Sequence, residues 1–420
     1  MDLSHGHAQQ LDQRDELASF RRHFAFAGES LIYLDGNSLG RPTLATIERL
    51  HTVLEEEWRG GLIRSWTTGW YEAPARIGEK IAALLGAGPG QVVASDATTV
   101  NLFKLAVAAL RARPERHVIV SDVLNFPSDL YVLQGCVDLL GNRHTMRLVP
   151  SADDRTIDPQ ALQAAIDEQV ALVCLSHVTF KSGFLHDMAA ITRRAHEMGA
   201  LVLWDVSHSV GAVPLALDQW DVDLAVGCTY KYLSGGPGAP AFLYVRRALQ
   251  EQLRSPIWGW LGQRAPFDFD RTYEPASGMA RFLVGTPPIL SLSAVEPALD
   301  LLLEAGIERI RRKSVALTSY CIDLFDALLA PLGFTLGSPR DARLRGSHVS
   351  MRHPEAWRIT RCLIEEMGVL PDYREPDNIR LGLAPLSTTF MEVWLAIDRL
   401  RQVVESARYL LLPASRHTVT

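Results

Sequence analysis

Lys231 lies between two tyrosines in the stretch AVGCTYKYLSGGPGAP, which spans residues 225–240. An apolar run typical of a buried strand precedes it, and a glycine-rich turn follows. A lysine amine at the end of a buried strand is desolvated, which favours the neutral form that adds to a carbonyl. A lone lysine in such a loop is more often a structural residue that reaches solvent. The setting makes Lys231 a candidate nucleophile that needs support from other residues.

Two other apolar runs, LVLW (201–204) and QVVAS (91–95), are also followed by polar residues. Asp205 comes directly after LVLW, and His208 lies three residues later. An aspartate there can bind a protonated ring nitrogen by a charge-assisted hydrogen bond, although capping a helix is its commoner role. His208 alone is more often a packed histidine than a catalyst. Thr98 and Thr99 open an amphipathic helix, whose first amides can bind phosphate, although a threonine cap alone would explain them.

Phe126 and Asp129 follow a third apolar run, HVIVSD, in the segment VLNFPSDLY. The Phe126 ring is placed to lie against a planar ligand, and Asp129 could bond to a substituent of that ligand. The alternative is that Pro-Ser-Asp only starts a helix.

These residues together predict a cofactor site. In an open α/β sheet, ligands bind outside the carboxyl ends of the strands. A phosphate cup, a stacking ring, an acid for a ring nitrogen and a Schiff-base lysine follow successive strands here, and pyridoxal 5′-phosphate (PLP) requires these four parts. The combination is more specific than any single residue. It predicts PLP bound covalently to Lys231, with Tyr230 able to reach the phosphate.

Six short apolar runs form the predicted sheet that positions these residues. They span residues 91–95, 117–122, 171–178, 200–208, 223–227 and 241–245. Because they are apolar throughout, they are typical of strands buried on both faces of a mostly parallel sheet. Helical patterns lie between them, at 101–113, 159–169 and 188–198. The alternation predicts an α/β fold with helices on both faces of the sheet.

The pattern changes after Leu290. Residues 294–333 read as one long helical stretch, followed by short strands near 346–353 and 378–386 and by a helix from Phe390. We therefore expect three segments. These are an N-terminal arm that joins the small domain (1–48), a large PLP-binding domain (49–289) and a smaller α+β C-terminal domain (290–420).

Composition excludes several classes of function. The 420 residues carry a net charge of −6, so no basic surface indicates nucleic acid or an anionic membrane as a partner. No apolar run reaches the roughly 20 residues that a membrane-spanning helix needs, and the N-terminus lacks the pattern of a signal peptide. The five cysteines are scattered without CxxC spacing. We therefore expect no disulfide framework, no metal site and a cytoplasmic location.

Seven segments carry a resemblance to a known family. They are YLDGNSLGRP (33–42), TTVNLFKL (98–105), NFPSDLY (125–131), KYLSGGPG (231–238), GWLGQ (259–263), FLVGTPPIL (282–290) and NIRLGLAPL (378–386). The DxxHxxG pattern at 205–211, followed by TYKYLSGGPG, resembles the PLP enzymes of fold type I in the aminotransferase class V group. The seven segments together resemble the bacterial kynureninases. The resemblance implies an aspartate aminotransferase-like fold for the whole chain.

The same resemblance implies roles for individual residues. Lys231 would carry the cofactor, Asp205 would pair with the pyridinium nitrogen, and Phe126 would stack on the ring. Tyr230 would contact the cofactor and is the candidate acid–base group. The other implied cofactor contacts are Thr98, Thr99, Ser128, Asp129, Ser176 and His208, with Trp260 and Thr286 reaching the phosphate held by a partner subunit.

The implied activity is hydrolysis of L-kynurenine to anthranilate and L-alanine in tryptophan degradation, by a homodimer with its site at the interface. Arg380 would hold the substrate's α-carboxylate by two parallel hydrogen bonds, and an ion pair with Asp377 is the alternative. Trp66 would lie near the aryl end of the substrate and favour L-kynurenine over its 3-hydroxy analogue. On residue type alone, packing with Trp58 and Trp70 is the better expectation for Trp66.

Two other functions stay open. Cysteine desulfurases share the class V architecture and need a nucleophilic cysteine on a flexible loop. The candidate here is Cys362, but its surroundings have helical periodicity, which favours a packed residue. A non-catalytic relative kept as a binding module would be expected to lose Lys231 or Asp205, and both are present.

Overall fold

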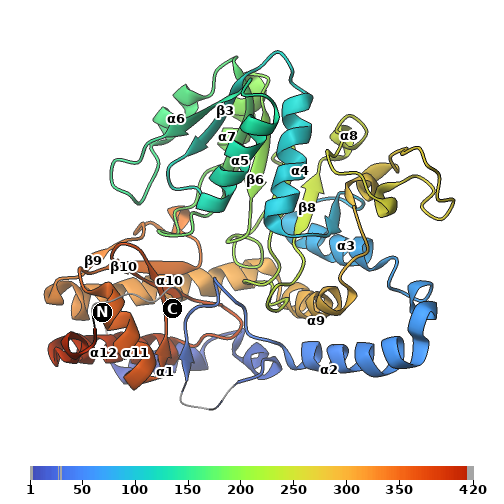
Figure 1. The fold of residues 1–420 in the computed structure, drawn as a ribbon. Coiled ribbons are helices and arrows are strands. Elements are labelled where there is room, and N and C mark those ends of the chain that lie inside the picture. The colour runs from blue at the N-terminus through green and yellow to red at the C-terminus, as the bar shows by residue number, and fades with distance from the viewer. Residues whose placement is uncertain (1–2, 27, 29–30, 414–420) are drawn as a thin grey trace.

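The computed structural model describes residues 3–26, 28 and 31–413 of the chain. Its largest feature is a seven-stranded sheet with the strand order β2-β8-β7-β6-β5-β3-β4 (Figure 1). The strands are β2 (Val92–Ala94), β3 (Val118–Asp122), β4 (Thr145–Val149), β5 (Val170–Ser176), β6 (Leu201–Asp205), β7 (Leu224–Gly227) and β8 (Phe242–Val245). Neighbouring strands are parallel except at β8, which is antiparallel to β2 and β7.

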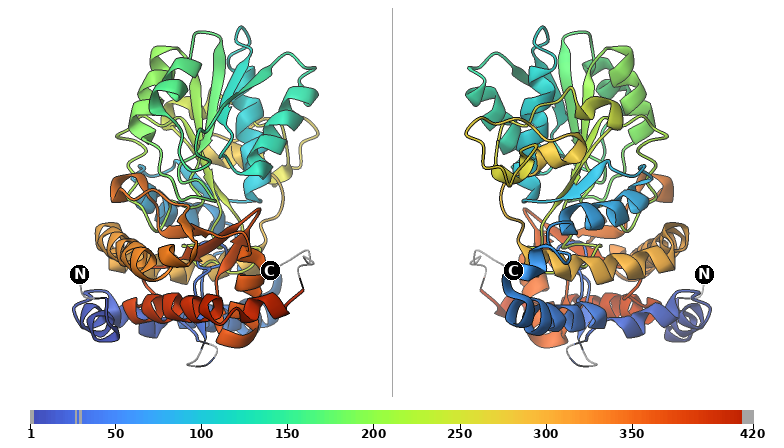
Figure 2. Two further views of the ribbon diagram at one scale, coloured as in Figure 1. Left: turned by 90° about the vertical axis from the view of Figure 1, so that its left-hand side faces the viewer. Right: turned by 90° about the vertical axis from the view of Figure 1, so that its right-hand side faces the viewer.

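Helices cover both faces of this sheet (Figure 2). In β6, Val202 and Trp204 pack in one apolar cluster and Leu201 and Leu203 in another, on the opposite face. The first cluster includes helices α3 (Ala73–Leu85), α6 (Pro159–Ala165) and α7 (Met188–Glu197), and the second includes α4 (Thr98–Arg111) and α5 (Pro127–Leu139). A strand covered on both faces is apolar at every position. The predicted α/β fold with a mainly parallel sheet between helices is therefore confirmed.

Three elements differ from the prediction. Strand β4 is missing from it, because β4 lies at the sheet edge and only Val149 of its residues is buried. The stretch 294–333 is two helices, α9 (Ile289–Ala305) and α10 (Ile307–Leu328), because Gly306 between them has a φ of +78°, outside the helical range. Helix α6 ends at Ala165, earlier than the predicted 159–169.

The C-terminal part is a second, antiparallel sheet with the order β12-β13-β10-β9. Its strands are β9 (Thr335–Leu336), β10 (His348–Arg352), β12 (Asp372–Arg374) and β13 (Asn378–Gly382). It shares an apolar cluster with α10, α11 (Ala356–Met367) and α12 (Phe390–Glu405). The predicted strands near 346–353 and 378–386 and the predicted helix from Phe390 are present.

The N-terminal segment contacts both parts of the molecule. Helix α1 (His5–Gln13) packs on α12, and β1 (Ile32–Tyr33) pairs in parallel with β11 (Val369–Leu370). Helix α2 (Leu44–Thr52) continues into the π-helical segment η2 (Val53–Gly61) and packs on α9. Helix α9 also packs on α3 and shares the core of the large sheet. The division at residues 48 and 289 stays a prediction.

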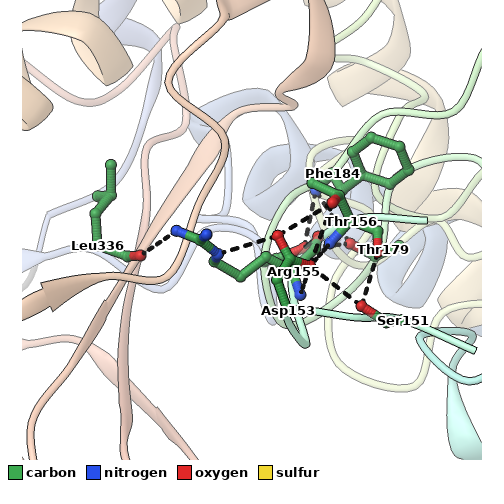
Figure 3. A network of polar contacts seen from close by, with 8 residues as sticks. Ser151, Asp153, Arg155, Thr156, Thr179, Phe184 and Leu336 are labelled. Atoms are coloured by element: carbon green, nitrogen blue, oxygen red, sulfur yellow. Dashed lines mark hydrogen bonds and ion pairs between the residues drawn. The ribbon is translucent and has the colours of Figure 1, made fainter. Parts of the chain in front are cut away.

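Arg155, in the loop between β4 and α6, links the two sheets (Figure 3). Its Nη1 donates to the backbone oxygen of Leu336 at 3.2 Å, and its own backbone oxygen accepts from Ser182 Oγ at 2.7 Å. Asp153 Oδ1 accepts from two backbone amides of the same loop, at 2.8 and 2.9 Å, which fixes the loop's shape. Ser182 also bonds Thr179 at 2.8 Å. The turn around Phe180 is therefore held to both sheets.

Three further findings concern the described part of the chain as a whole. No helix within it is long and apolar enough to cross a bilayer. It contains no group of three or more His, Cys, Asp or Glu side chains that could hold a metal ion. All five cysteines are buried and none forms a disulfide.

Candidate active site

A cavity of about 460 Å³ lies at the carboxyl ends of the parallel strands. Its size is within the range of small-molecule sites. Of the residues predicted from the sequence, it is lined by Thr98, Thr99, Phe126, Ser128, Asp129, Asp205, Tyr230, Lys231 and Thr286. Residues spaced over nearly 190 positions of the chain thus meet in one cavity. All of them except Thr286 lie at or after the carboxyl end of a strand at the same edge of the sheet, whereas Thr286 comes from the loop before α9 (Ile289–Ala305).

Lys231 follows β7 in the turn that the glycine-rich sequence forms. Its Nζ lies 3.2 Å from Nε2 of His208 and 5.8 Å from the centroid of the Phe126 ring. Burial, and next the charge of Lys231, lower the pKa of His208 well below its usual range. His208 is therefore a neutral neighbour of Lys231.

The backbone of the lysine turn is held by the N-terminal segment. The amide of Gly40 donates to the backbone oxygen of Tyr230 at 2.8 Å. A Cβ atom at Gly40 would lie 2.3 Å from the backbone oxygen of Lys231, so only glycine permits this approach. The YLDGNSLGRP segment (33–42) therefore supports the turn that carries Lys231.

Two buried carboxylic acids, Asp205 and Asp129, face each other in the cavity wall. Asp205 Oδ1 accepts from the amide of Ser207 at 2.8 Å. Asp129 Oδ2 is buried and accepts no hydrogen bond from the described residues, and Asp205 can bond to Asp129 only when one of the two acids is protonated. Burial, and next the carboxylate of Asp205, raise the pKa of Asp129 well above its usual range. In the part of the chain that the structure describes, this pair of acids has no hydrogen-bond donor facing it from the cavity. The cavity has room for a protonated ring nitrogen, which would be such a donor.

The N-termini of α4 and α5 both open into the cavity. Helix α4 begins at Thr98, and its first amides have no acceptor within the helix. Thr99 Oγ1 lies 3.3 Å from Ser128 Oγ, which belongs to the first turn of α5. These hydroxyl groups and amides form an anion site of the kind a phosphate group requires.

Phe126 is fixed by Asn125 and Phe180, which the sequence did not single out, and by Ser176, which it did. Its amide donates to Asn125 Oδ1 at 2.8 Å, and Ser176 Oγ donates to the same oxygen at 2.7 Å. The ring of Phe180 meets the Phe126 ring edge-on, with centroids 5.3 Å apart and planes at 78°. Ser176, predicted to contact the cofactor, therefore acts here through Asn125 and does not line the cavity. Asn125 and Phe180 also follow strands, β3 and β5, but their residue types did not indicate a contact with a cofactor, and their roles are to hold Phe126 in place.

Arg380 lies near the site but does not line the cavity. It is on β13, only 1% exposed, and its Nη2 forms an ion pair with Asp372. The guanidinium also donates to the backbone oxygen of Phe180 at 2.5 Å and to Ser38 Oγ at 2.8 Å. Asp377, the alternative partner, pairs with Arg352 at 3.1 Å. The sequence missed Asp372 because it comes from a neighbouring strand.

Two predicted tryptophans lie outside this chain's own cavity. Trp66 meets Trp70 edge-on at 5.9 Å, and Trp70 Nε1 donates to Glu57 at 2.6 Å. Trp260 is 36% exposed and contacts the ring of Phe267. Their predicted roles therefore depend on a second subunit.

The cavity fits PLP on the chemistry of its donors. An amine, an acid pair with an unpartnered oxygen, an aromatic ring and an anion site line one space of suitable volume. These groups match the aldehyde, ring nitrogen, ring face and phosphate of that cofactor.

Comparisons with known proteins agree with this site. Residues 310–400 match the family model of the kynureninase C-terminal domain, and residues 54–214 match that of the DegT/DnrJ/EryC1/StrS aminotransferase family. A kynureninase from Pseudomonas fluorescens is 46% identical over 416 residues, which is 98% of either chain. A kynureninase from Burkholderia pseudomallei is 44% identical over 94% of either chain.

Solved structures with similar folds include a cysteine desulfurase from Thermococcus onnurineus. It superposes with a TM-score of 0.78 at 18% identity, covering 90% of this chain and 95% of its own. The cystine C-S lyase C-DES, in complex with its product cysteine persulfide, gives 0.77 at 19% identity, covering 88% of this chain and 97% of its own. At these identities the likeness concerns the fold, whereas the near full-length relatives at 46% and 44% identity establish the family. The chain belongs to the kynureninase family.

Proposed function

We propose that this chain, a PLP-dependent hydrolase, cleaves L-kynurenine to anthranilate and L-alanine in the cavity around Lys231. One observation carries the assignment of the site: Lys231, Asp205, Phe126 and Thr98, from four different strand ends, line one cavity. The two relatives named kynureninase support the choice of substrate. The 3-hydroxy analogue is the weaker substrate in this proposal.

Each residue has a role in holding the cofactor. Thr98, Thr99, Ser128 and Tyr230 would hold the phosphate, and Phe126 would lie on the ring. When bound, PLP supplies a ring that accepts electrons and makes the substrate's α-proton acidic. Asp205, with Asp129 facing it, would hold a proton at the ring nitrogen, while Ser176 acts through Asn125 and His208 lies beside Lys231.

Lys231 and Tyr230 are the proton carriers of the proposed reaction. Lys231 Nζ faces the cavity and would take the proton from the substrate's α-carbon. Burial, and next the Cys228 thiol, raise the pKa of Tyr230 above its usual value, so its hydroxyl stays protonated at neutral pH. Water adds to the aryl ketone, and its oxygen becomes part of the anthranilate carboxylate when the neighbouring carbon–carbon bond breaks. Tyr230 would act as the acid that protonates the carbon left on the alanine side.

Arg380 would bind the substrate's α-carboxylate after an exchange of partners. In the structure its guanidinium forms an ion pair with Asp372 and donates hydrogen bonds to Ser38 Oγ and the Phe180 backbone oxygen. A substrate carboxylate that forms two parallel hydrogen bonds would compete with the Asp372 carboxylate for this guanidinium. Substrate binding and a rearrangement of this cluster therefore occur together.

A second subunit would complete the site. Large apolar side chains are exposed in two segments, with Ile63 and Phe269 each 76% exposed. Exposed apolar side chains that cluster on a surface are typical of protein interfaces. We propose a homodimer in which Trp66 lies at the aryl end of the partner's substrate and Trp260 reaches the partner's cofactor phosphate. Thr286, for which the sequence predicted the same role, lines this chain's own cavity. We also propose the domain division at residues 48 and 289, and a cytoplasmic location consistent with unpaired cysteines.

Sulfur chemistry is disfavoured by the position of Cys362. This residue is fully buried in α11, and burial raises the pKa of its thiol to about 11. A nucleophilic cysteine needs an accessible thiol with a lowered pKa.

The test supplies the purified protein with PLP and compares two substrates. We expect fluorescent anthranilate from L-kynurenine and no sulfide from L-cysteine, with Lys231→Ala as the inactive control. Sulfide release without anthranilate would replace this proposal by desulfurase activity. Equal turnover by the control would show that the cavity around Lys231 is not the site.

A further inference from the structure

Lys104 is a fully buried cation directly behind the cavity wall. It lies in the middle of α4 and has no exposed surface. Its Nζ is 2.7 Å from Asp96 Oδ2 and 2.7 Å from the backbone oxygen of Phe282. A lysine is rarely buried to this extent, because burial disfavours its charged form unless a partner compensates. Burial lowers the pKa of Lys104, and Asp96 opposes that shift.

Asp96 connects this cation to the cavity. It lines the cavity two residues before Thr98, and its side chain is 26% exposed. Its φ of +50° is a conformation that asparagine and aspartate tolerate best among non-glycine residues. Its backbone oxygen accepts from the amide of Ala241 at 2.8 Å. Asp96 thus joins the start of α4 to the start of β8.

Phe282 connects the same cation to a third part of the wall. The residues that follow it, 285–288, line the cavity beside the N-terminus of α4. Lys104 therefore holds together three segments of the wall at the end where the phosphate would bind.

The charges at this end have opposite effects on an anion. The carboxylate of Asp96 would repel a phosphate group at the N-terminus of α4, and the ammonium of Lys104 cancels that repulsion. We propose that Lys104 is a positioning residue that neutralises Asp96 and so makes this end of the cavity selective for a phosphate. The inference rests on the proposed placement of the PLP phosphate at Thr98 and Thr99.

The test measures binding of PLP and of pyridoxal, which lacks the phosphate, to the cofactor-free protein. Lys104→Met keeps the side-chain length and removes the charge. We expect it to raise the Kd for PLP by at least about tenfold, or ~1.4 kcal/mol, and the Kd for pyridoxal by less than about threefold. Adding Asp96→Asn to Lys104→Met should bring the Kd for PLP back to within about threefold of the unmodified protein.

If Lys104→Met does not fold, the Kd for PLP of Asp96→Asn alone gives an independent test. Asp96→Asn removes the anion, keeps the cation and suits the backbone conformation, so the Kd for PLP should stay the same or fall. Lys80, which pairs with Glu296 and Asp300 away from the cavity, supplies the matched control Lys80→Met, which should leave both Kd values unchanged.

Two results would overturn the proposal. One is an equal rise of both Kd values in Lys104→Met with no recovery in the double variant, which would indicate lost packing only. The other is a rise of about tenfold or more in the Kd for PLP in Asp96→Asn alone. If the unmodified protein binds PLP no more tightly than pyridoxal, the placement of the phosphate itself fails, and that outcome is separate from the role of Lys104.

Discussion

Replacing Asp372 by asparagine should destabilise the protein by about 3 kcal/mol. The carboxylate of Asp372 and the guanidinium of Arg380 are both 2% exposed at their side chains and form an ion pair. Removing one partner of a buried pair costs about 3–5 kcal/mol, because the other charge remains buried. Asp35, whose carboxylate is 4.0 Å from Arg380, offsets part of that loss, which favours the lower end of the range.

The same substitution should change how stability depends on pH. Burial, and next the charge of Asp372, raise the pKa of Asp35 from 3.8 to about 6. The folded protein therefore keeps a proton on Asp35 between about pH 4 and pH 6 where the unfolded chain has lost it. The contribution of Asp35 to the free energy of unfolding is present at low pH. It is lost as the pH rises through 6, and the loss is at most ~3 kcal/mol. Without Asp372 the pKa of Asp35 falls, and this decline becomes smaller.

Urea unfolding followed by far-ultraviolet circular dichroism, at several pH values, measures both effects. Asp326→Asn is the matched control, because Asp326 pairs with Arg340 at the surface and such pairs contribute about 0–1 kcal/mol. A loss below about 1 kcal/mol for Asp372→Asn, equal to the control, would refute the account of Arg380 as a buried charge that depends on Asp372.

The remaining predictions concern catalysis. Lys231→Ala should abolish anthranilate production while PLP is still retained through its phosphate contacts, and near-normal turnover would reject the lysine's role. Asp205→Ala should lower kcat by several orders of magnitude, because a charge-assisted bond of about 1.5–3 kcal/mol in binding is lost and more is lost in the transition state. A decrease of less than about tenfold would mean that Asp129 protonates the ring nitrogen instead. The unmodified protein should prefer L-kynurenine over 3-hydroxy-L-kynurenine in kcat/KM by at least about tenfold, or ~1.4 kcal/mol, and Trp66→His should narrow that ratio. An unchanged ratio would assign Trp66 to packing against Trp70.

The sequence predicted those parts of the site that follow a buried strand. Lys231, Asp205 and Thr98 could be found because an apolar run ends just before each of them, and parallel strands bring such ends together. The same logic missed β4, whose edge position removes the continuous apolar pattern. It also missed the break at Gly306, since one glycine within a helical pattern is often tolerated.

Residues that act through other residues were harder to predict. Asp372 and Phe180 reach Arg380 from different parts of the chain, and nothing in their local sequence marks that contact. Lys104 resembles any lysine of an amphipathic helix until its complete burial is seen. Cofactor contacts follow from strand order, whereas the contacts that support them depend on tertiary packing.

The contacts of Arg380 have a consequence for synthesis of the chain. The guanidinium bonds to Phe180 and Ser38, which lie 200 and 342 residues earlier. Contacts between such distant residues form only after both segments have been synthesised. A chain that leaves the ribosome N-terminus first could therefore bring its strand ends together before Arg380 is present to bind a carboxylate. A nascent chain that ends before β13 would expose Ser38 and the Phe180 carbonyl without their guanidinium partner. Arg380 would then be synthesised after every residue that lines the cofactor cavity.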